Sequence, residues 1–161
     1  MKSAFEPVRY RERLHPAWWL WLIVAGISVS MGAAYGGPFG ATVGWATGLS
    51  TAVLTTAGLI AWSPVIQVGG GQLLAGRAHI DIGFVGDVNE LDKTHAATTR
   101  GRDADTRAWM LLRGWIPTAL RVDITDPADP TPYWYLSTRH PHQLASAIVH
   151  ERLESERSMR G

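Results

Sequence analysis

The apolar positions of this chain follow two different patterns, one long uninterrupted stretch and a later series of short segments. Residues 16–76 contain no Asp, Glu, Lys or Arg, so every charged side chain lies before or after that stretch. A soluble domain needs charges at intervals on its surface. A bilayer core excludes them, because each charge placed there costs about 2.5–3.5 kcal/mol. The stretch is therefore predicted to lie in a membrane.

Two spans fit within this stretch, the first at about residues 17–35 and the second at about residues 40–62. At about 1.5 Å per residue, some twenty helical residues cross a hydrocarbon core of about 30 Å. The residues between them, 36–39, are too few for anything but a turn. Residues 16–62 are thus expected to form a two-helix transmembrane hairpin that returns to the side it started from.

Basic and aromatic residues flank the hairpin in the way that is typical of membrane interfaces. Arginines precede the first span, tryptophans open it, and another tryptophan closes the second span. Lys2 adds a further positive charge, whereas the turn carries none, so the positive-inside rule predicts a multi-pass protein of the cell membrane with both termini cytoplasmic. Residues 1–15 are then a basic cytoplasmic segment. The expected interface anchors are Arg9, Arg11, Arg13, Trp18, Trp19, Trp21 and Trp62.

Two other interpretations of the apolar stretch remain open. A cleaved signal peptide also has a basic start and an apolar core, but here the apolar stretch is long, no clean A-x-A site follows it, and a second span comes at once. A helical hairpin in the core of a soluble protein is the second alternative, and the complete lack of charges makes it less favourable.

Glycines recur at every fourth position across the hairpin. Such small-xxx-small stripes let helix backbones approach closely. The stripe either packs the two helices of the hairpin together or forms a docking face for a membrane-protein partner or a second copy of the chain. Neither span holds an ionisable group, which makes a proton or ion relay improbable. The expected helix-packing residues are Gly32, Gly36, Gly40, Gly44 and Gly48.

After Trp62 the chain turns to short segments rich in β-branched and aromatic residues, separated by Gly, Pro and Asp. Residues 94–106 are polar and are interpreted as a loop or a short irregular helix. The proline-rich segment 126–132 is a rigid turn, because proline fixes φ and lacks a donor. Strands are expected at residues 64–68, 72–75, 78–82, 84–91, 108–113, 119–124 and 133–137.

A C-terminal helix is expected from Pro141 to about residue 156, with apolar positions that can cover a sheet. About seven short strands followed by one amphipathic helix is the element order of a pleckstrin-homology-like (PH-like) barrel. Residues 63–161 are therefore expected to form a cytoplasmic PH-like domain of antiparallel strands, and the fold class of the chain is α+β.

The composition excludes several kinds of site. The chain has no cysteine, so disulfides and thiolate metal sites are ruled out. From Arg77 onward there are 11 basic and 12 acidic residues, about −1, which argues against nucleic-acid binding. No nucleophile elbow, P-loop or dinucleotide motif is present. No catalytic residue, cofactor or metal is predicted.

Three segments resemble a known family. They are Tyr10–Leu14 ahead of Pro16–Trp19, the segment Arg113–Ile116, and the turn Asp126–Trp134 with Ser137–Arg139 after it. Together they are similar to the actinobacterial two-span membrane proteins grouped as domain of unknown function 3093. The resemblance implies two transmembrane helices and a small cytoplasmic β domain. It implies no activity.

Two groups near the proline-rich turn could carry chemistry. Asp123, Asp126 and Asp129 invite a metal interpretation, but their spacing matches no Ca²⁺ loop, and Asp before Pro commonly forms turns. His140 and His142 flank Pro141, where a helix start is the simpler interpretation.

A third group could bind a lipid phosphate or a partner carboxylate if its arginines converge on one face, although scattered surface arginines are the plainer account. Packing in the core or near the membrane is the plainer account of Trp115, but an exposed patch of Trp115, Ile116 and Pro117 would instead mark a contact site. This candidate contact surface comprises Arg113, Trp115, Arg121 and Arg139.

Three functions are compatible with these features. The first is a non-catalytic, membrane-anchored interaction or accessory protein, whose β domain binds a protein partner or lipid headgroup and whose glycine face packs with a membrane partner or a second copy. The second is an enzyme at the membrane surface that uses Asp126, Asp129, Arg139 and His140. The third is a subunit of a transporter or envelope complex.

Overall fold

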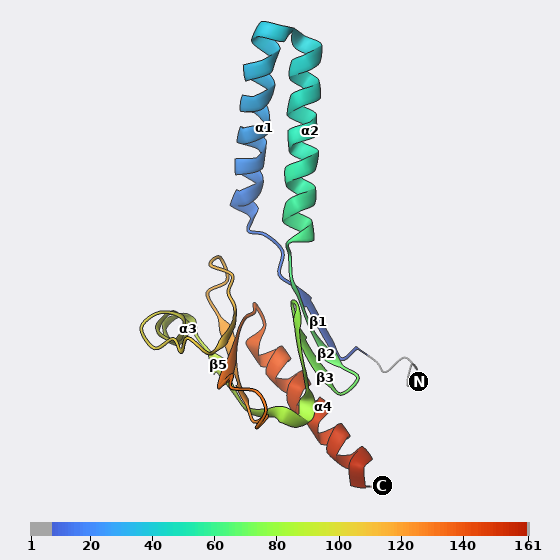
Figure 1. The fold of residues 1–161 in the computed structure, drawn as a ribbon, viewed down its shortest axis with the longest axis vertical. Helices are drawn as coiled ribbons and strands as arrows, with labels where there is room; N and C mark the ends of the chain where they lie inside the picture. The colour runs from blue at the N-terminus through green and yellow to red at the C-terminus, as the bar shows by residue number, and fades with distance from the viewer. Residues whose placement is uncertain (1–7, 161) are drawn as a thin grey trace. The chain divides into compact units, whose positions relative to one another are not determined.

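The computed structural model describes residues 8–160, with side chains described up to Ser158 (Figure 1). Lys2 and the start of the predicted basic segment lie outside the described residues. The chain divides into two compact units, the segment His15–Ser63 and the described part of Met1–Leu14 together with Pro64–Gly161. The residues before the apolar segment therefore belong to the same unit as the residues after it.

The apolar segment forms two helices, α1 (Trp18–Phe39) and α2 (Ala41–Ala61), each long and apolar enough to span a membrane. The predicted turn at residues 36–39 is wrong, because α1 continues through them with Pro38 inside its last turn. The chain reverses instead at Gly40, whose φ of 92° is readily available only to glycine. Its N–H closes α1 by donating to Gly36 O over 3.0 Å.

The first sheet has four antiparallel strands in the order β1-β2-β3-β4, and its edge strand β1 was not foreseen from the sequence. β1 pairs with β2 so that Arg13 lies opposite Val65. These two strands flank the hairpin in sequence. After α2 the chain therefore re-enters the β domain next to the strand from which it left. The strands are β1 (Tyr10–Arg13), β2 (Val65–Gly69), β3 (Gln72–Ala75) and β4 (Ala78–Asp81).

The second sheet has the order β5-β7-β8-β6. The prediction of a wholly antiparallel domain is wrong here, because β6 pairs with β8 in parallel. In this sheet β8 lies between β6 and β7, which follow one another in sequence. The chain that connects β6 to β7 therefore reverses direction and crosses from one side of β8 to the other. A 3₁₀ turn, η1 (Ile82–Phe84), precedes the sheet. Its strands are β5 (Val85–Leu91), β6 (Trp109–Leu111), β7 (Ala119–Ile124) and β8 (Tyr133–Ser137).

Every residue of the central strand β8 is buried, so both faces of this sheet are covered. Trp134 and Leu136 join the main apolar core, whereas Tyr133 and Tyr135 pack on the other face. That second face is covered by α3 (Lys93–Arg100), a regular helix in the polar segment for which the sequence predicts a loop or a short irregular helix.

The C-terminal helix α4 (Pro141–Arg160) contacts both sheets and buries Leu144 and Ile148 in the main core. Among the described residues no strand ladder joins the two sheets, so the predicted closed barrel is not formed and a PH-like topology is not confirmed. The first sheet instead takes its fourth strand, β1, from ahead of the hairpin. The domain is thus two sheets and α4 around the main core, and α3 covers the other face of the second sheet (Figure 1).

Candidate functional site

Glycines bring the backbones of α1 and α2 into contact along the hairpin. A Cβ added at Gly44 would lie 2.7 Å from both Gly32 O and Gly36 Cα, and one added at Gly48 would lie 3.1 Å from Ser28 O. Gly40 belongs to the turn, and nothing lies within 4 Å of a Cβ built on it. Four of the five predicted glycines, Gly32, Gly36, Gly44 and Gly48, therefore lie where the two helix backbones meet. An apolar groove of about 570 Å³ runs beside the seam, bordered by Trp45 and small residues of both helices.

Two sets of aromatic residues lie at opposite ends of the hairpin. Trp18, Trp19 and Trp21 open α1, and Trp62 follows α2, as the sequence indicated. Tyr35 lies 17 positions after Trp18, and Trp45 lies 17 positions before Trp62, which places each pair about 26 Å apart along a helix. Sequence reasoning missed this second set, although the shared spacing could have revealed it. All six side chains are exposed.

The arginines before the hairpin are part of the β domain. Arg9 forms ion pairs with Glu151, 3.3 Å away, and with Glu154, both on α4. Glu151 also accepts from Gly71 N at 2.7 Å, which links the β2–β3 turn to the same helix. Arg11 and Arg13 are exposed on β1.

Glu12 is a buried carboxylate of β1 that holds together two ends of the domain. It accepts hydrogen bonds from the Tyr10 hydroxyl at 2.8 Å, the Thr138 hydroxyl at 2.5 Å and the Arg139 N–H at 3.0 Å. Thr138 and Arg139 follow β8, so this network connects the strand ahead of the hairpin to the segment that leads into α4. Burial raises the pKa of Tyr10 above its usual range, and the Glu12 carboxylate beside it raises it further.

The predicted contact surface of Arg113, Trp115, Arg121 and Arg139 is only partly assembled. The Arg113 guanidinium lies 5.9 Å from the Trp115 ring. The backbone N–H of Arg113 donates to the hydroxyl of Ser137, which is near Arg139 in sequence. Arg121 instead packs over Tyr133, on the face covered by α3, and pairs with Asp123 at 2.9 Å. Ile116, which only the alternative of an exposed patch placed beside Trp115, is buried.

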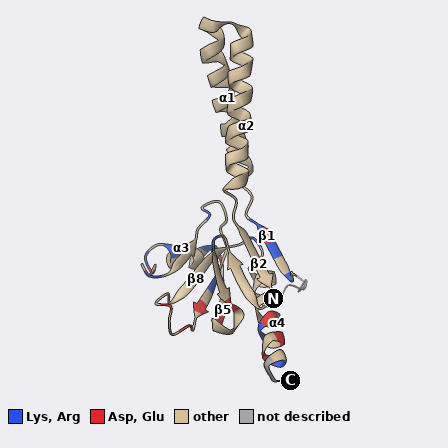
Figure 2. Cartoon of the chain, turned by 45° about the vertical axis from the view of Figure 1, so that its right-hand side comes forward, with Lys and Arg blue, Asp and Glu red and all other residues tan. Residues whose placement is uncertain are grey.

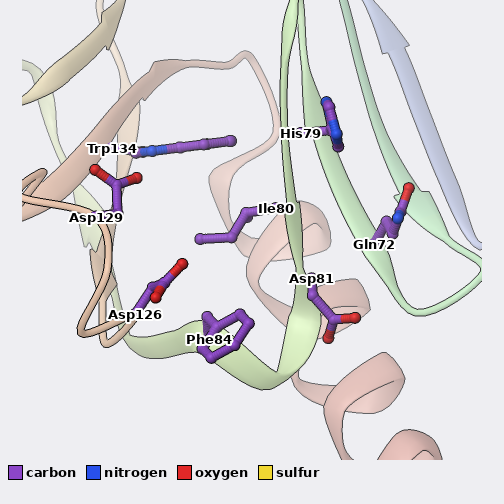
Figure 3. Close-up of a pocket in the computed structure, with 8 residues that line it drawn as sticks. All are labelled: Gln72, His79, Ile80, Asp81, Phe84, Asp126, Asp129 and Trp134. Atoms are coloured by element: carbon purple, nitrogen blue, oxygen red, sulfur yellow. The ribbon is translucent and has the colours of Figure 1, made fainter.

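An acidic and aromatic cleft opens between β4 and the turn that precedes β8. It has a volume of about 290 Å³, and Figure 3 shows Trp134, Asp126 and Asp129 on one side, Ile80 on the other and Phe84 at the base. Asp81, Gln72 and His79 on β3 and β4 complete its rim. The two walls come from segments about 45 residues apart, so the sequence alone could not bring them together.

The aspartates of the cleft are held in place by their own turns. Asp126 accepts from Ala128 N at 2.8 Å, and Asp129 accepts from Thr131 N at 2.9 Å. Hydrogen bonds from the hydroxyl and then the N–H of Thr131 lower the pKa of Asp129, so this carboxyl is charged at neutral pH. These bonds occupy one oxygen of each carboxylate.

The residues of the enzymatic hypothesis do not come together. Asp126 and Asp129 precede β8, whereas Arg139 and His140 follow it, and five strand residues separate the two pairs by about 16 Å. The His140 N–H donates to the Thr138 hydroxyl at the Glu12 network. Within residues 8–160, no three His, Asp or Glu side chains are placed to hold a metal ion.

A family model described as protein of unknown function (DUF3093) matches residues 9–148, nearly the whole chain. Searches of the curated proteins and of the solved structures found no match.

Proposed function

We propose, since the chain belongs to the family described as protein of unknown function (DUF3093), that it is a membrane-anchored, non-catalytic interaction protein. Its hairpin inserts into the cell membrane, and its β domain binds a partner at the membrane surface.

The observation that carries the proposal is an exposed apolar surface without charge. Only Ser28 of α1 and Gly44 of α2 are buried, whereas a core helix of a soluble protein is mostly buried. Figure 2 shows that the whole hairpin is free of charged residues, while the β domain carries both signs. An apolar surface of this extent is incompatible with water, and lipid is the solvent that suits it.

Two further features fit this placement. The aromatic sets about 26 Å apart match the interfaces of a hydrocarbon core of about 30 Å. Three hydroxyls inside the helices donate to backbone carbonyls of their own helix: Ser28 to Val24 O at 2.7 Å, Thr51 to Thr47 O at 2.8 Å and Thr55 to Thr51 O at 2.6 Å. Such bonds satisfy a hydroxyl in a medium without water.

The experiment is extraction of membranes from cells that express the full chain. Alkaline carbonate and high salt should leave the protein in the membrane pellet, and detergent should release it. A peripheral protein held by charges would leave with salt or carbonate, so release without detergent would overturn the proposal.

The orientation has its own test, because the chain contains no native cysteine. We propose that both termini are cytoplasmic. Gly37→Cys in the last turn of α1, just before the reversal at Gly40, has open space for a side chain and should then react with an impermeant maleimide on intact cells. Ser158→Cys on α4 should react only after permeabilisation. If only Ser158→Cys reacted on intact cells, the termini would lie on the outer side of the membrane. If both cysteines reacted on intact cells, the hairpin turn and the termini would not lie on opposite sides of the membrane.

A further inference from the structure

We infer that the β domain docks on anionic phospholipid headgroups through arginines at the end from which the chain leaves for the hairpin. This inference rests on the proposed function and deepens it, because it names the partner that the β domain binds at the membrane surface. Arg121 takes no part, since it packs over Tyr133 on the face covered by α3. The docking surface, called the basic end below, comprises Arg13, Arg77, Arg113 and Arg139.

The first two of these arginines lie at the same end of the first sheet. The Leu14 N–H donates to Pro64 O over 3.0 Å, and a Cβ added at Gly76 would lie 3.5 Å from the Cβ of Pro64. Arg13 directly precedes Leu14, and Arg77 directly follows Gly76 in the turn between β3 and β4. Both arginines are exposed.

The other two arginines are brought to this end by hydrogen bonds of their own backbone. The Arg113 N–H donates to the Ser137 hydroxyl at 3.0 Å, and two residues later the Arg139 N–H donates to the Glu12 carboxylate, also at 3.0 Å. Glu12 is on β1, next to Arg13. Four segments that are distant in sequence thus meet at one end of the domain, and each contributes one arginine.

The basic end has a single sign of charge on its surface. The segments that contain its arginines are residues 12–14, 75–78, 111–117 and 137–140. Their one acidic residue is Glu12, which is buried. Figure 2 shows acidic residues on α4 and near β5 instead. A surface of one sign attracts the opposite charge, and the guanidinium group matches the geometry of phosphate oxygens.

The tether to the hairpin makes lipid the partner of this surface. Residues 15–17 link Leu14 to α1, and residues 62–63 link α2 to Pro64. A residue spans at most about 3.6 Å, so each linker is shorter than about 15 Å. The cytoplasmic leaflet of a membrane carries negative charge from its acidic lipids, and basic groups beside a membrane span are attracted to it. The linkers hold the basic end within reach of that charge.

Apolar groups beside the arginines suit the headgroup region. The ring of Trp115 is half-buried with the Arg113 guanidinium 5.9 Å away, and Leu112 is 40% exposed. Tryptophan favours the level of the headgroups, where one side of the ring is apolar and the other is wet. Burial lowers the pKa of Arg113, because it removes part of the water that stabilises the cation, and a phosphate oxygen would offset that loss.

The test uses the full chain in lipid nanodiscs, with a fluorophore on Gly114→Cys, where nothing lies within 4 Å of an added Cβ. The discs hold phosphatidylcholine, alone or mixed equally with phosphatidylglycerol, and a lipid with a spin-labelled headgroup as quencher. Quenching should be about twofold or more stronger with phosphatidylglycerol, and the difference should shrink in high salt. A label on Ala128→Cys, in the turn before β8, should show no difference. Equal quenching of the Gly114→Cys label in both discs would overturn the inference.

Variants assign the docking to the basic end. Arg77→Gln with Arg113→Gln should remove most of the difference between the two lipids. Arg77→Gln alone, at an exposed position of a turn, should reduce it and provides the test should the double variant not fold. Arg102→Gln with Arg107→Gln removes the same charge from an exposed loop and should retain the difference. An equal loss in this matched control would show that net charge alone acts, which contradicts the inference.

An acidic protein segment is the competing occupant. The peptide amide acetyl-Glu-Glu-Glu-Glu, added to the discs with phosphatidylglycerol, should leave the quenching unchanged. If the peptide abolished the quenching, the basic end would be assigned to an acidic protein and the inference would be wrong. Failure of the chain to enter either disc would instead contradict the membrane anchor, which carbonate extraction tests separately.

Discussion

The hairpin and the β domain are each stabilised by a different kind of internal contact. In the hairpin the contact is backbone against backbone, because glycines such as Gly32 and Gly44 leave no side chain between the helices. In the β domain the contact is made by large apolar side chains, with Leu120, Tyr135 and Leu136 fully buried. The large apolar residues of the hairpin point outward instead.

This difference shows how the surroundings decide which residues hold a fold together. In water, burying large apolar side chains is the main driving force, worth about 25 cal/mol per Å². In lipid that force is absent, and helices associate through close packing of small residues. Substitutions in the two units should therefore fail for different physical reasons.

The largest effect is expected from removing volume in the domain core. Leu136→Ala should lower the free energy of unfolding of the β domain by about 2–5 kcal/mol, because Leu136 is fully buried between β7 and β6. Urea unfolding in detergent, followed by near-ultraviolet circular dichroism, would measure it. Leu112→Ala, at a position 40% exposed, is the control, and an equal loss there would break the comparison.

Adding side-chain volume, in contrast, should disrupt the packing of the hairpin. Gly44→Leu adds a side chain where even a Cβ would lie 2.7 Å from the facing backbone, so the helices must separate, at a cost of about 1–3 kcal/mol. Distances between spin labels on α1 and α2 would detect the separation. Gly58→Leu is the matched control on the same helix, because nothing lies within 4 Å of a Cβ there. Equal distances in both variants would show that the seam is not set by glycine.

Glu12 tests whether the strand ahead of the hairpin is an integral part of the domain. Glu12→Ala leaves three donors without their acceptor and should destabilise the domain by about 1–3 kcal/mol. Arg11→Ala, an exposed neighbour on β1, should cost less than about 0.5 kcal/mol. The comparison is made by thermal unfolding in detergent. If the two variants melt together, β1 is only an appendage.

The smallest effect is expected on the stability of the β domain at alkaline pH. The pKa of Tyr10 in the fold is raised above its unfolded value of about 10. The stability tied to its neutral form is therefore complete below pH 10 and is lost as the pH rises further. Unfolding at pH 8, 10 and 11 should show a decline that Tyr10→Phe makes shallower. Identical pH profiles for the two proteins would show that this hydroxyl does not titrate with folding.

The sequence revealed the parts of the fold that depend on local composition. The missing charges of residues 16–62 predicted both apolar helices, and alternation predicted the strand at residues 78–82, which the structure has as β4. The C-terminal helix begins at Pro141, as expected.

The parts that depend on distant pairing could not be predicted. Tyr10–Arg13 looks like a basic anchor, and only its partner Val65–Val68, some fifty residues later, makes it a strand. The parallel pairing of β6 and the cover that α3 gives to Tyr135 are likewise set by contacts far along the chain. The cleft is the clearest case. The sequence predicts a turn that contains Asp126 and Asp129, but it gives no sign that Ile80 and Phe84 lie next to that turn.

The most direct measurement of the central claim is the depth of Val53, near the midpoint between Trp45 and Trp62 and 65% exposed. A spin label on Val53→Cys in proteoliposomes should collide often with oxygen, which dissolves in hydrocarbon, and rarely with a water-soluble nickel chelate. A label on Ser158→Cys should show the reverse. If the two labels were equally accessible to the nickel chelate, the hairpin would lie in water and the account of this protein as membrane-anchored would be wrong.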